Sequence, residues 1–214
     1  MATETHLHLV SGYFRSGKST FIKEFLVPLY NPHVVVLEDI LDDIPKAEKS
    51  PSSVDFASKQ NPFALVRNLR QEGLRNEQIE LQFNQWILGE YVGRISAALG
   101  MHEHVVGENH ALQTLAPQDR MGMVEKLRAT GKVASINAYY MDADLPGCFR
   151  RMVEKDMGMN PGIARRATLP EFERMMQNVK PTLAEANVYD SLFTVKGTPG
   201  HCNEWEVSVK PTQI

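Results

Sequence analysis

Short apolar runs recur along the chain at the lengths typical of buried strands. Leu7, Leu9 and Val10 mark one such run within residues 6–11, and HVVVL at 33–37 is a second. Runs of this length without polar alternation are typical of strands covered on both faces of a sheet. The same pattern predicts further strands at 104–107, 133–141 and 192–195, and a candidate edge strand at 204–209.

Helical patterns occupy the intervals between these runs. The longest covers residues 76–99, where apolar side chains recur at every third or fourth position. A helix that begins at Lys18 is expected to end before Pro28, because proline has no amide hydrogen for a helix interior. Shorter helices are predicted at 62–71, 117–130 and 170–179, and another from Asp144 as its N-cap. Strands that alternate with helices predict an α/β fold, a three-layer sandwich around a five-stranded, mostly parallel sheet.

Composition and charge set limits on the function. With 43% hydrophobic and 23% charged residues, the 214-residue chain has the composition of a globular protein and the length for one full core. A net charge of −3 gives no general attraction to nucleic acid, so contact with a polyanion would need a local basic patch. Two cysteines are too few for a disulfide framework, and no apolar run approaches the ~20 residues of a membrane span. With no signal-peptide pattern, the sequence predicts a cytoplasmic protein.

The stretch GYFRSGKS at residues 12–19 lies between the first predicted strand and the helix that begins at Lys18. It fits the pattern GxxxxGK[ST] at every fixed position and has the strand–loop–helix context that this phosphate-binding loop requires. Its glycines let the backbone approach a phosphate closely, and amide groups at a helix N-terminus attract the anion. Lys18 is expected to reach the β- and γ-phosphates of a nucleoside triphosphate, and Ser19 to bind Mg²⁺. The residues expected to contact the nucleotide are Gly12, Tyr13, Phe14, Arg15, Ser16, Gly17, Lys18, Ser19 and Thr20.

A triphosphate-binding protein could be a switch, a motor or a kinase. A GTPase switch would need a guanine-reading motif of the Asn-Lys-x-Asp type, and the sequence contains none. The stretch DLPG at 144–147 imitates a switch motif, but it follows the fourth predicted strand and is better interpreted as a helix cap. The chain is also short for a motor ATPase. These patterns favour a kinase.

Acidic residues follow two of the predicted strands. Glu38 and Asp39 end the second strand, and Glu108 ends the third. Ligands of open α/β sheets bind at the carboxyl ends of the strands. There Asp39 could accept the proton of an attacking hydroxyl or hold the metal through water, and Glu108 could lie near Mg²⁺ or bind substrate. The alternatives are solvent-exposed acids at Glu38 and Asp39 and a structural hydrogen-bonding group at Glu108.

Four arginines flank the glycine- and proline-containing segment MGMNPGIA. They are Arg150, Arg151, Arg165 and Arg166. Phosphoryl transfer builds negative charge on the transferred group, and planar guanidinium groups stabilise that charge. A mobile lid that carries arginines would supply these groups and exclude water at the same time. Each arginine taken alone could equally be a surface charge, but the cluster favours a lid.

In order and spacing, these pieces resemble the kinase domain of the phage polynucleotide kinases and their relatives, which include the zeta-toxin kinases. The resemblance covers roughly residues 5–197. It implies a P-loop kinase core with a helical lid, ATP and Mg²⁺ as cofactors, and a hydroxyl group as acceptor. By position it also implies Asp39 as the general base, and Arg151 with Arg165 or Arg166 as lid arginines. The stretches that carry it are GYFRSGKSTFIKEF, the strand that ends in Glu38-Asp39, GENHALQTLAPQDR, AYYMDADLPGCFRR and ARRATLPEFERMM.

The departures from that family concern the acceptor side. Asp42 stands where the phage enzyme has an arginine that grips a substrate phosphate, and Glu108 stands where an aspartate is usual. Some phage relatives phosphorylate hydroxymethylated pyrimidines within DNA, and zeta-type relatives phosphorylate a sugar nucleotide. The acidic net charge is mildly in favour of a small acceptor.

The sequence therefore predicts a single P-loop kinase domain over residues 1–214, with a lid at about 146–170 and an acceptor-binding insert at about 42–100. The expected reaction is transfer of the γ-phosphate of ATP to a hydroxyl on a nucleic acid or nucleotide, as in DNA modification. The first alternative is a kinase for a small molecule or sugar nucleotide. The second is a regulatory nucleotide-binding protein that transfers nothing. No membrane partner is expected, and the oligomeric state stays open.

Overall fold

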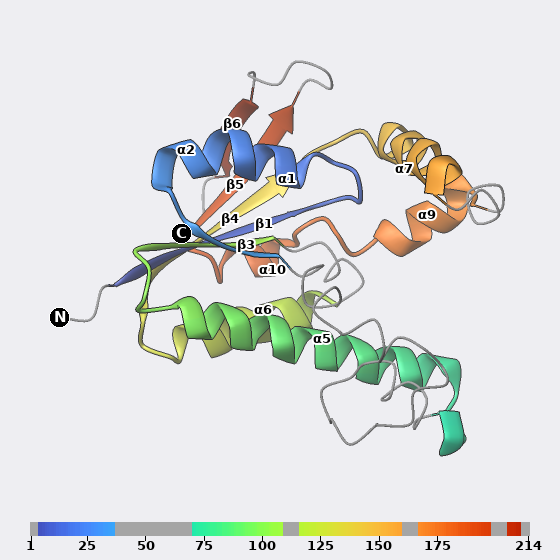
Figure 1. Ribbon diagram of the computed structural model, residues 1–214, viewed down its shortest axis with the longest axis horizontal. Coiled ribbons are helices and arrows are strands. Elements are labelled where there is room, and N and C mark those ends of the chain that lie inside the picture. Colours follow the sequence, from blue (N-terminus) through green and yellow to red (C-terminus); the bar gives the residue numbers. More distant parts are fainter. Residues whose placement is uncertain (1–3, 37–69, 109–115, 160–166, 198–204, 211–214) are drawn as a thin grey trace.

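The structure, a computed structural model, describes residues 4–36, 70–108, 116–159, 167–197 and 205–210. Strands and helices alternate along the chain in this part (Figure 1). The strands are β1 (Thr5–Gly12), β2 (His33–Val36), β3 (His104–Glu108), β4 (Val133–Met141), β5 (Ser191–Gly197) and β6 (Trp205–Lys210). The helices are α1 (Lys18–Phe21), the π-helical turn η1 (Ile22–Leu26), α2 (Val27–Tyr30), α5 (Asn76–Ala98), α6 (Pro117–Arg128), α7 (Leu145–Met159), α9 (Leu169–Met176) and α10 (Leu183–Ala186).

The strands form one sheet in the order β2-β3-β1-β4-β5-β6. The first five are parallel, and β6 pairs with β5 in the antiparallel direction. The predicted parallel five-stranded core is thus confirmed, and the candidate edge strand makes the sheet six-stranded. In the register, Glu108 of β3 pairs with Val10 of β1 and with Val36 of β2. The carboxyl ends of these three neighbouring strands therefore lie side by side at the same end of the sheet.

Helices cover both faces of this sheet (Figure 1). On one face, α5 and α6 enclose a hydrophobic core that includes Leu7, Leu9 and Tyr91. On the other face, α1 and η1 pack Phe21 and Leu26 against β1, β3 and β4. The pair α7 and α9 lies beyond the carboxyl ends of the strands, next to the loop that follows β1. The predicted three-layer arrangement is confirmed.

The first helical segment contains one error of prediction. Its turns were expected to end before Pro28, yet they continue through α2 to Tyr30. The reason is η1, in which the amide of Val27 bonds to the carbonyl of Ile22, five residues back, rather than four. This wider turn ends at Leu26, two residues before the proline, which cannot donate to the ladder. The segment ends instead at Asn31, whose φ of 43° is left-handed.

The other boundaries lie close to their predictions where the structure describes them. Residues 133–141 are a strand as predicted, and α5 covers 76–98 of the predicted 76–99. Asp144 caps α7, because its Oδ2 accepts a hydrogen bond from the Gly147 amide at 2.7 Å. Most of the predicted helix 62–71 lies outside the described residues, as does the first part of the predicted insert at 42–100. Among the residues placed in the structure, no helix combines the length and apolarity needed to cross a membrane.

Two groups of polar side chains are buried inside the layers. Beneath α2, the His8 ring is 2% exposed, stacks on Tyr30 with centroids 4.7 Å apart, and places Nε2 3.1 Å from Nδ1 of His104. Burial, followed by the nearby rings of His104 and His6, lowers the pKa of His8 to about 4. The His8 ring is therefore neutral in the folded protein at neutral pH.

The second group is an ion pair between α6 and α10. Arg120 donates from Nε to Oε1 of Glu185 at 2.6 Å and from Nη2 to Oε2 at 2.8 Å. The two side chains are only 6% and 1% exposed. Oε2 of Glu185 also accepts from the amide of Thr182, which closes the capping box of α10. The pair holds two helices together without exposing either charge.

Candidate functional site

The loop between β1 and α1 has a backbone that two glycines make possible. A Cβ atom at Gly12 would lie 2.6 Å from Cβ of Met141 and 2.8 Å from Oγ of Ser16, too close for any side chain. Gly17 has a φ of 94° and is the N-cap of α1. Both positions therefore need glycine, one for space and the other for its left-handed backbone. The motif predicted from sequence has the tight turn that phosphate binding requires.

Lys18 lies inside the loop rather than in solvent. It is 3% exposed, and its Nζ donates to the carbonyl oxygens of Gly12 at 3.1 Å and Tyr13 at 2.9 Å. A buried ammonium needs such partners, because an unpaired one would cost several kcal/mol of desolvation. The contacts hold the charge of Lys18 at the centre of the turn.

The side chains of Ser19, in α1, and Glu108, at the end of β3, are in contact. The Ser19 hydroxyl donates to Oε1 of Glu108 at 2.8 Å, and Glu108 is only 6% exposed. Behind Glu108, the hydroxyl of Tyr91 is fully buried, and burial, then the Glu108 charge, raises the pKa of that phenol. The two residues expected near Mg²⁺ thus lie within direct hydrogen-bonding distance of each other.

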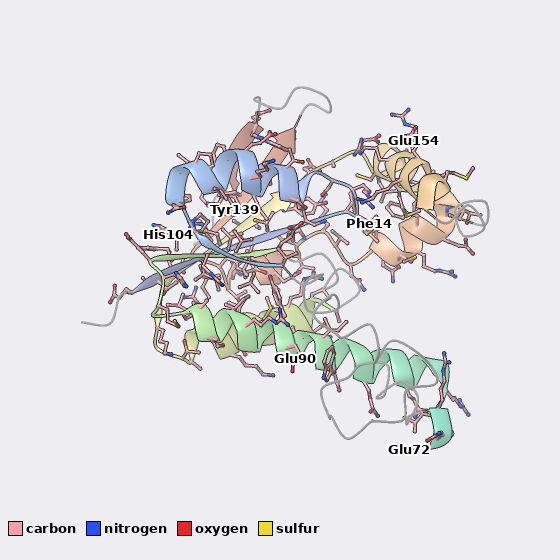
Figure 2. The ribbon with its side chains drawn as sticks, viewed as in Figure 1. Phe14, Glu72, Glu90, His104, Tyr139 and Glu154 are labelled. Carbon is pink, nitrogen blue, oxygen red and sulfur yellow. The ribbon has the colours of Figure 1, made fainter. Side chains whose placement is uncertain are left out.

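Tyr13 and Phe14 join the loop to the helices beyond the sheet. Both rings pack against a cluster that includes Cys148 of α7 and Phe172 of α9. Phe14 lies on the side of the loop that faces these helices (Figure 2). The side chains at the two variable positions after Gly12 therefore pack against α7 and α9. The sequence analysis predicted these residues only as nucleotide contacts.

Arg151 is fixed at the loop by its own hydrogen bonds. Its Nε donates to the backbone oxygen of Arg15 at 3.1 Å, and its Nη2 to Sγ of Cys148 at 3.3 Å. Burial raises the pKa of the Cys148 thiol, against the opposing effect of the Arg151 charge, so the sulfur stays protonated. The first predicted lid arginine is thus held beside the phosphate-binding loop.

The remaining predicted site residues divide into two groups. Thr20 on α1 and Arg150 on α7 are both exposed. Asp39, Arg165 and Arg166 lie outside the described residues, and their roles stay predictions.

Two features of the loop were not predicted. The ring of Trp205 lies against it, with Cη2 3.5 Å from the position of a Cβ at Gly17. Nothing in the local sequence indicates this contact, because Trp205 belongs to the last strand. The other is the backbone of Arg15, which has a φ of 63°. Its position between the two glycines could have drawn attention to it, since tight turns often need a positive φ.

The loop fits a bound phosphate chain. Its buried atoms include Nε of Arg15 and Oγ of Ser16, neither of which has a hydrogen-bond partner in the described part of the chain. Buried donors without partners are uncommon in folded proteins and suggest a missing ligand. Together with the glycine-bounded turn and the charge of Lys18, these donors suit an anion. The paired hydroxyl and carboxylate of Ser19 and Glu108 are oxygen ligands of the kind that Mg²⁺ prefers.

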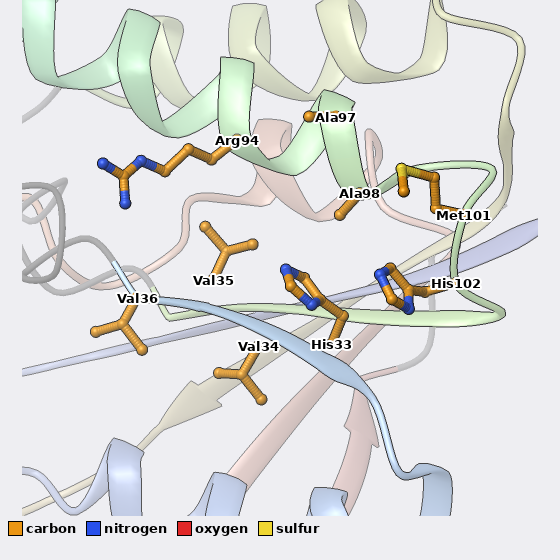
Figure 3. A pocket seen from close by; sticks show the side chains of 9 residues that line it. All are labelled: His33, Val34, Val35, Val36, Arg94, Ala97, Ala98, Met101 and His102. Carbon is orange, nitrogen blue, oxygen red and sulfur yellow. The ribbon is translucent and has the colours of Figure 1, made fainter.

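A separate pocket of about 340 Å³ lies at the edge of the sheet, between β2 and the end of α5 (Figure 3). The rings of His33 and His102 lie side by side in it, with centroids 4.5 Å apart. It is lined by all four residues of β2 and by Arg94 of α5. None of the predicted site residues lines this pocket, and β3 separates β2 from the strand that carries the loop.

Comparisons with known proteins match the fold. No family model matches the sequence, and no curated protein matches it. A presumed kinase from Chloroflexus aurantiacus j-10-fl is similar in structure, with a TM-score of 0.56, 9% identity, and coverage of 92% of this chain and 87% of that one. A structure from the PezAT chromosomal toxin-antitoxin system of Streptococcus pneumoniae has a TM-score of 0.50, 10% identity, and coverage of 91% and 69%. Identities this low indicate a shared fold and no more. The chain shares its α/β fold with these two structures.

Proposed function

We propose that the protein is an ATP-dependent kinase that transfers the γ-phosphate to a hydroxyl group of a second substrate. The observation that supports this most strongly is the 2.8 Å hydrogen bond between Ser19 and Glu108, beside a glycine-bounded loop that buries Lys18. A carboxylate and a hydroxyl at adjacent strand ends, next to a lysine, are the groups that phosphoryl transfer needs. The P-loop kinase fold is consistent with this chemistry.

The donor side of the proposed reaction rests on the loop. Backbone amides of residues 13–19 would cradle the phosphates, and Lys18 would neutralise charge on the β- and γ-phosphates. Ser19 and Glu108 would hold Mg²⁺, which would supply positive charge to offset the charge of the phosphates. Thr20, which is exposed on α1, would contact the phosphates beside them.

Arginines would stabilise the transferred group. Arg151 lies beside the loop, since its Nε bonds to the oxygen of Arg15. With Arg165 or Arg166 it would contact the equatorial phosphoryl oxygens, as guanidinium groups in kinase lids do. The proposed lid at about 146–170 would also exclude water, because water in the site would hydrolyse the donor.

Asp39 is the proposed general base. It follows the last residue of β2 by three positions, and a carboxylate there would orient the acceptor hydroxyl and take its proton. Glu108 is less suited, because its Oε1 accepts the hydrogen bond of Ser19. Asp39→Asn is expected to slow transfer by about two to four orders of magnitude while ATP binding persists. Transfer at the normal rate by this variant would assign the base role to Glu108.

The acceptor is proposed to be a hydroxyl on a nucleic acid or nucleotide, bound by an insert at about 42–100. The resemblance to polynucleotide kinases supports this choice. A small acceptor such as a sugar nucleotide is the alternative, and the net charge of −3 favours it because polynucleotide binding usually needs a basic surface. A regulatory protein that binds nucleotide without transfer is the third candidate.

One labelling experiment separates these three. The full chain is incubated with ATP labelled in the γ-phosphate and with four acceptors in turn: 5′-hydroxyl oligonucleotides, DNA with hydroxymethyluracil, nucleosides and sugar nucleotides. Lys18→Ala serves as the blank. Label in either DNA supports the nucleic-acid kinase, and label in a small acceptor supports the alternative. Nucleotide binding without label in any acceptor contradicts the kinase.

A further inference from the structure

Arg15 has a backbone conformation that its side chain makes unfavourable. Among the described residues, only Arg15 and Asn31 are non-glycine residues with positive φ, at 63° and 43°. Asparagine tolerates the left-handed region because its short amide can bond to nearby backbone, whereas a long side chain such as arginine does not have this advantage. An outlier of this kind is a reason to ask what the side chain does.

The conformation belongs to the loop and not to arginine as such. The amide of Ser16 donates to the oxygen of Tyr13 at 3.0 Å, so residues 13–16 form a turn with Arg15 at its third position. A turn with positive φ at this position favours glycine or asparagine. Arg151 fixes the same turn from outside, through its bond to the oxygen of Arg15. Glycine at position 15 would therefore satisfy the backbone better than arginine.

The guanidinium group of Arg15 is held at the loop with an unused donor. Its Cζ lies 4.8 Å from the centroid of the Phe14 ring, a cation–π contact. Its Nε is buried and has no hydrogen-bond partner in the parts of the chain that the structure places. A buried donor left without a partner is unfavourable unless a ligand completes it.

Two described carboxylates in this region already accept hydrogen bonds from other groups. Glu108 accepts from Ser19, and Asp144 accepts from the amide of Gly147. No described carboxylate hydrogen-bonds to Nε of Arg15, so an anion from outside the described residues can complete this donor. The loop itself supplies the position of that anion, because its amides and Lys18 suit a phosphate.

We propose that Arg15 is a phosphate-binding residue, whose guanidinium donates from within the loop to an oxygen of the bound nucleoside triphosphate. This inference rests on the proposed function, since it assumes that the loop binds a triphosphate. It adds a cation that the motif GxxxxGK[ST] does not contain, because position 15 is one of its variable positions.

The test exploits the backbone of Arg15. Arg15→Gly removes the guanidinium group and suits the positive φ. Arg15→Lys keeps the positive charge but lacks the planar guanidinium group. Asn31→Gly is the matched control, since it relieves the other left-handed position at the end of α2, away from the loop. Each full-length variant is studied by thermal unfolding and by calorimetric titration with MgATP and MgADP.

For Arg15→Gly we expect a melting temperature at or above that of the wild type, and an affinity for MgATP lower by about tenfold to a hundredfold, the size of a hydrogen bond to a charged group. Arg15→Lys should recover part of that affinity. Asn31→Gly should bind MgATP like the wild type. A larger loss with MgATP than with MgADP would place the contact at the γ-phosphate, and equal losses would place it at the inner phosphates.

The negative outcomes are distinct. Wild-type protein that gives no heat with MgATP overturns the proposed function and this inference with it. Wild-type binding that Arg15→Gly leaves unchanged overturns the inference alone. A fall in melting temperature together with affinity also overturns it, because Arg15 would then act by holding Phe14 and the fold.

Discussion

The hydroxyl of Ser19, at the start of α1, donates a hydrogen bond to Oε1 of Glu108, at the end of β3, across 2.8 Å. The two residues are 89 positions apart in the sequence. They meet because β1 and β3 are parallel neighbours, with Val10 in register with Glu108. The bond links the phosphate-binding loop to the strand next to it, and it concentrates oxygen ligands at one point.

Glu108→Gln should weaken the response to Mg²⁺. The amide still accepts from Ser19 but lacks the negative charge that favours a divalent cation. We expect the Mg²⁺ concentration for half-maximal transfer to rise by about tenfold to a hundredfold, the usual effect of losing a group that orients a metal ligand. The measurement is a Mg²⁺ titration at fixed ATP. Glu103→Gln is the control, because its side chain is 73% exposed; an unchanged titration for Glu108→Gln would remove the metal role.

Lys18→Ala should abolish transfer. Its Nζ bonds to two carbonyl oxygens of the loop, so the variant loses both a cation and the contacts that shape the turn. A rate loss of about 10²–10³ or more is expected, as for other preorganised donors. The assay is γ-phosphate transfer, with Lys23→Ala as the control because Lys23 is exposed on the next turn. Equal losses in both variants would contradict a specific role.

The stability of the fold should decrease in mild acid because of His8. Its pKa is about 4 in the folded protein, against an ordinary value of 6.5, so between these values the unfolded chain takes up a proton that the folded chain does not. Its contribution is present above pH 6.5 and is lost as the pH falls toward 4, by about 3 kcal/mol over the whole window.

This dependence is measured by urea unfolding at several pH values between 7 and 4. His8→Gln should flatten the curve relative to the wild type, while His33→Gln, whose ring is exposed, should leave its shape unchanged. Parallel curves for wild type and His8→Gln would show that His104, His6 or the carboxylates carry the dependence instead.

Glu185→Gln should strongly destabilise the protein. It leaves the guanidinium of Arg120 buried without its counter-charge, a change that typically costs about 3–5 kcal/mol. The free energy of unfolding in urea gives the effect. Arg128→Gln is the matched control, since the pair of Arg128 and Asp190 is 39% and 43% exposed and should contribute under about 1 kcal/mol. Similar losses from the two variants would mean that burial does not decide the strength of these pairs.

The sheet was predictable because burial on both faces leaves a continuous apolar run. The strand at 133–141 was predicted to its ends, and its buried second half, which ends in Tyr139, Tyr140 and Met141, is such a run. The end of the first helix was not, because the rule for Pro28 assumes an α-helical ladder, and the π-helical turn before it removes the conflict. Local patterns describe backbone hydrogen bonds only where the regular spacing holds.

The site was predictable in part. The motif identified the glycines, Lys18 and Ser19, because their chemistry follows from a fixed spacing. It could not give the conformation of Arg15, since the motif leaves that position open. The pair of Arg120 and Glu185 had no local signal at all, because 65 residues separate its members.

The contact between Trp205 and the loop provides an intrinsic fluorescence probe of nucleotide binding. The chain has two tryptophans, and the other, Trp86, packs on the opposite face of the sheet with α5. Since indole emission responds to nearby charge, a filled loop should alter the fluorescence of Trp205. With Trp86 replaced by phenylalanine, occupancy by any nucleotide could be followed in real time without a label and before the acceptor is known.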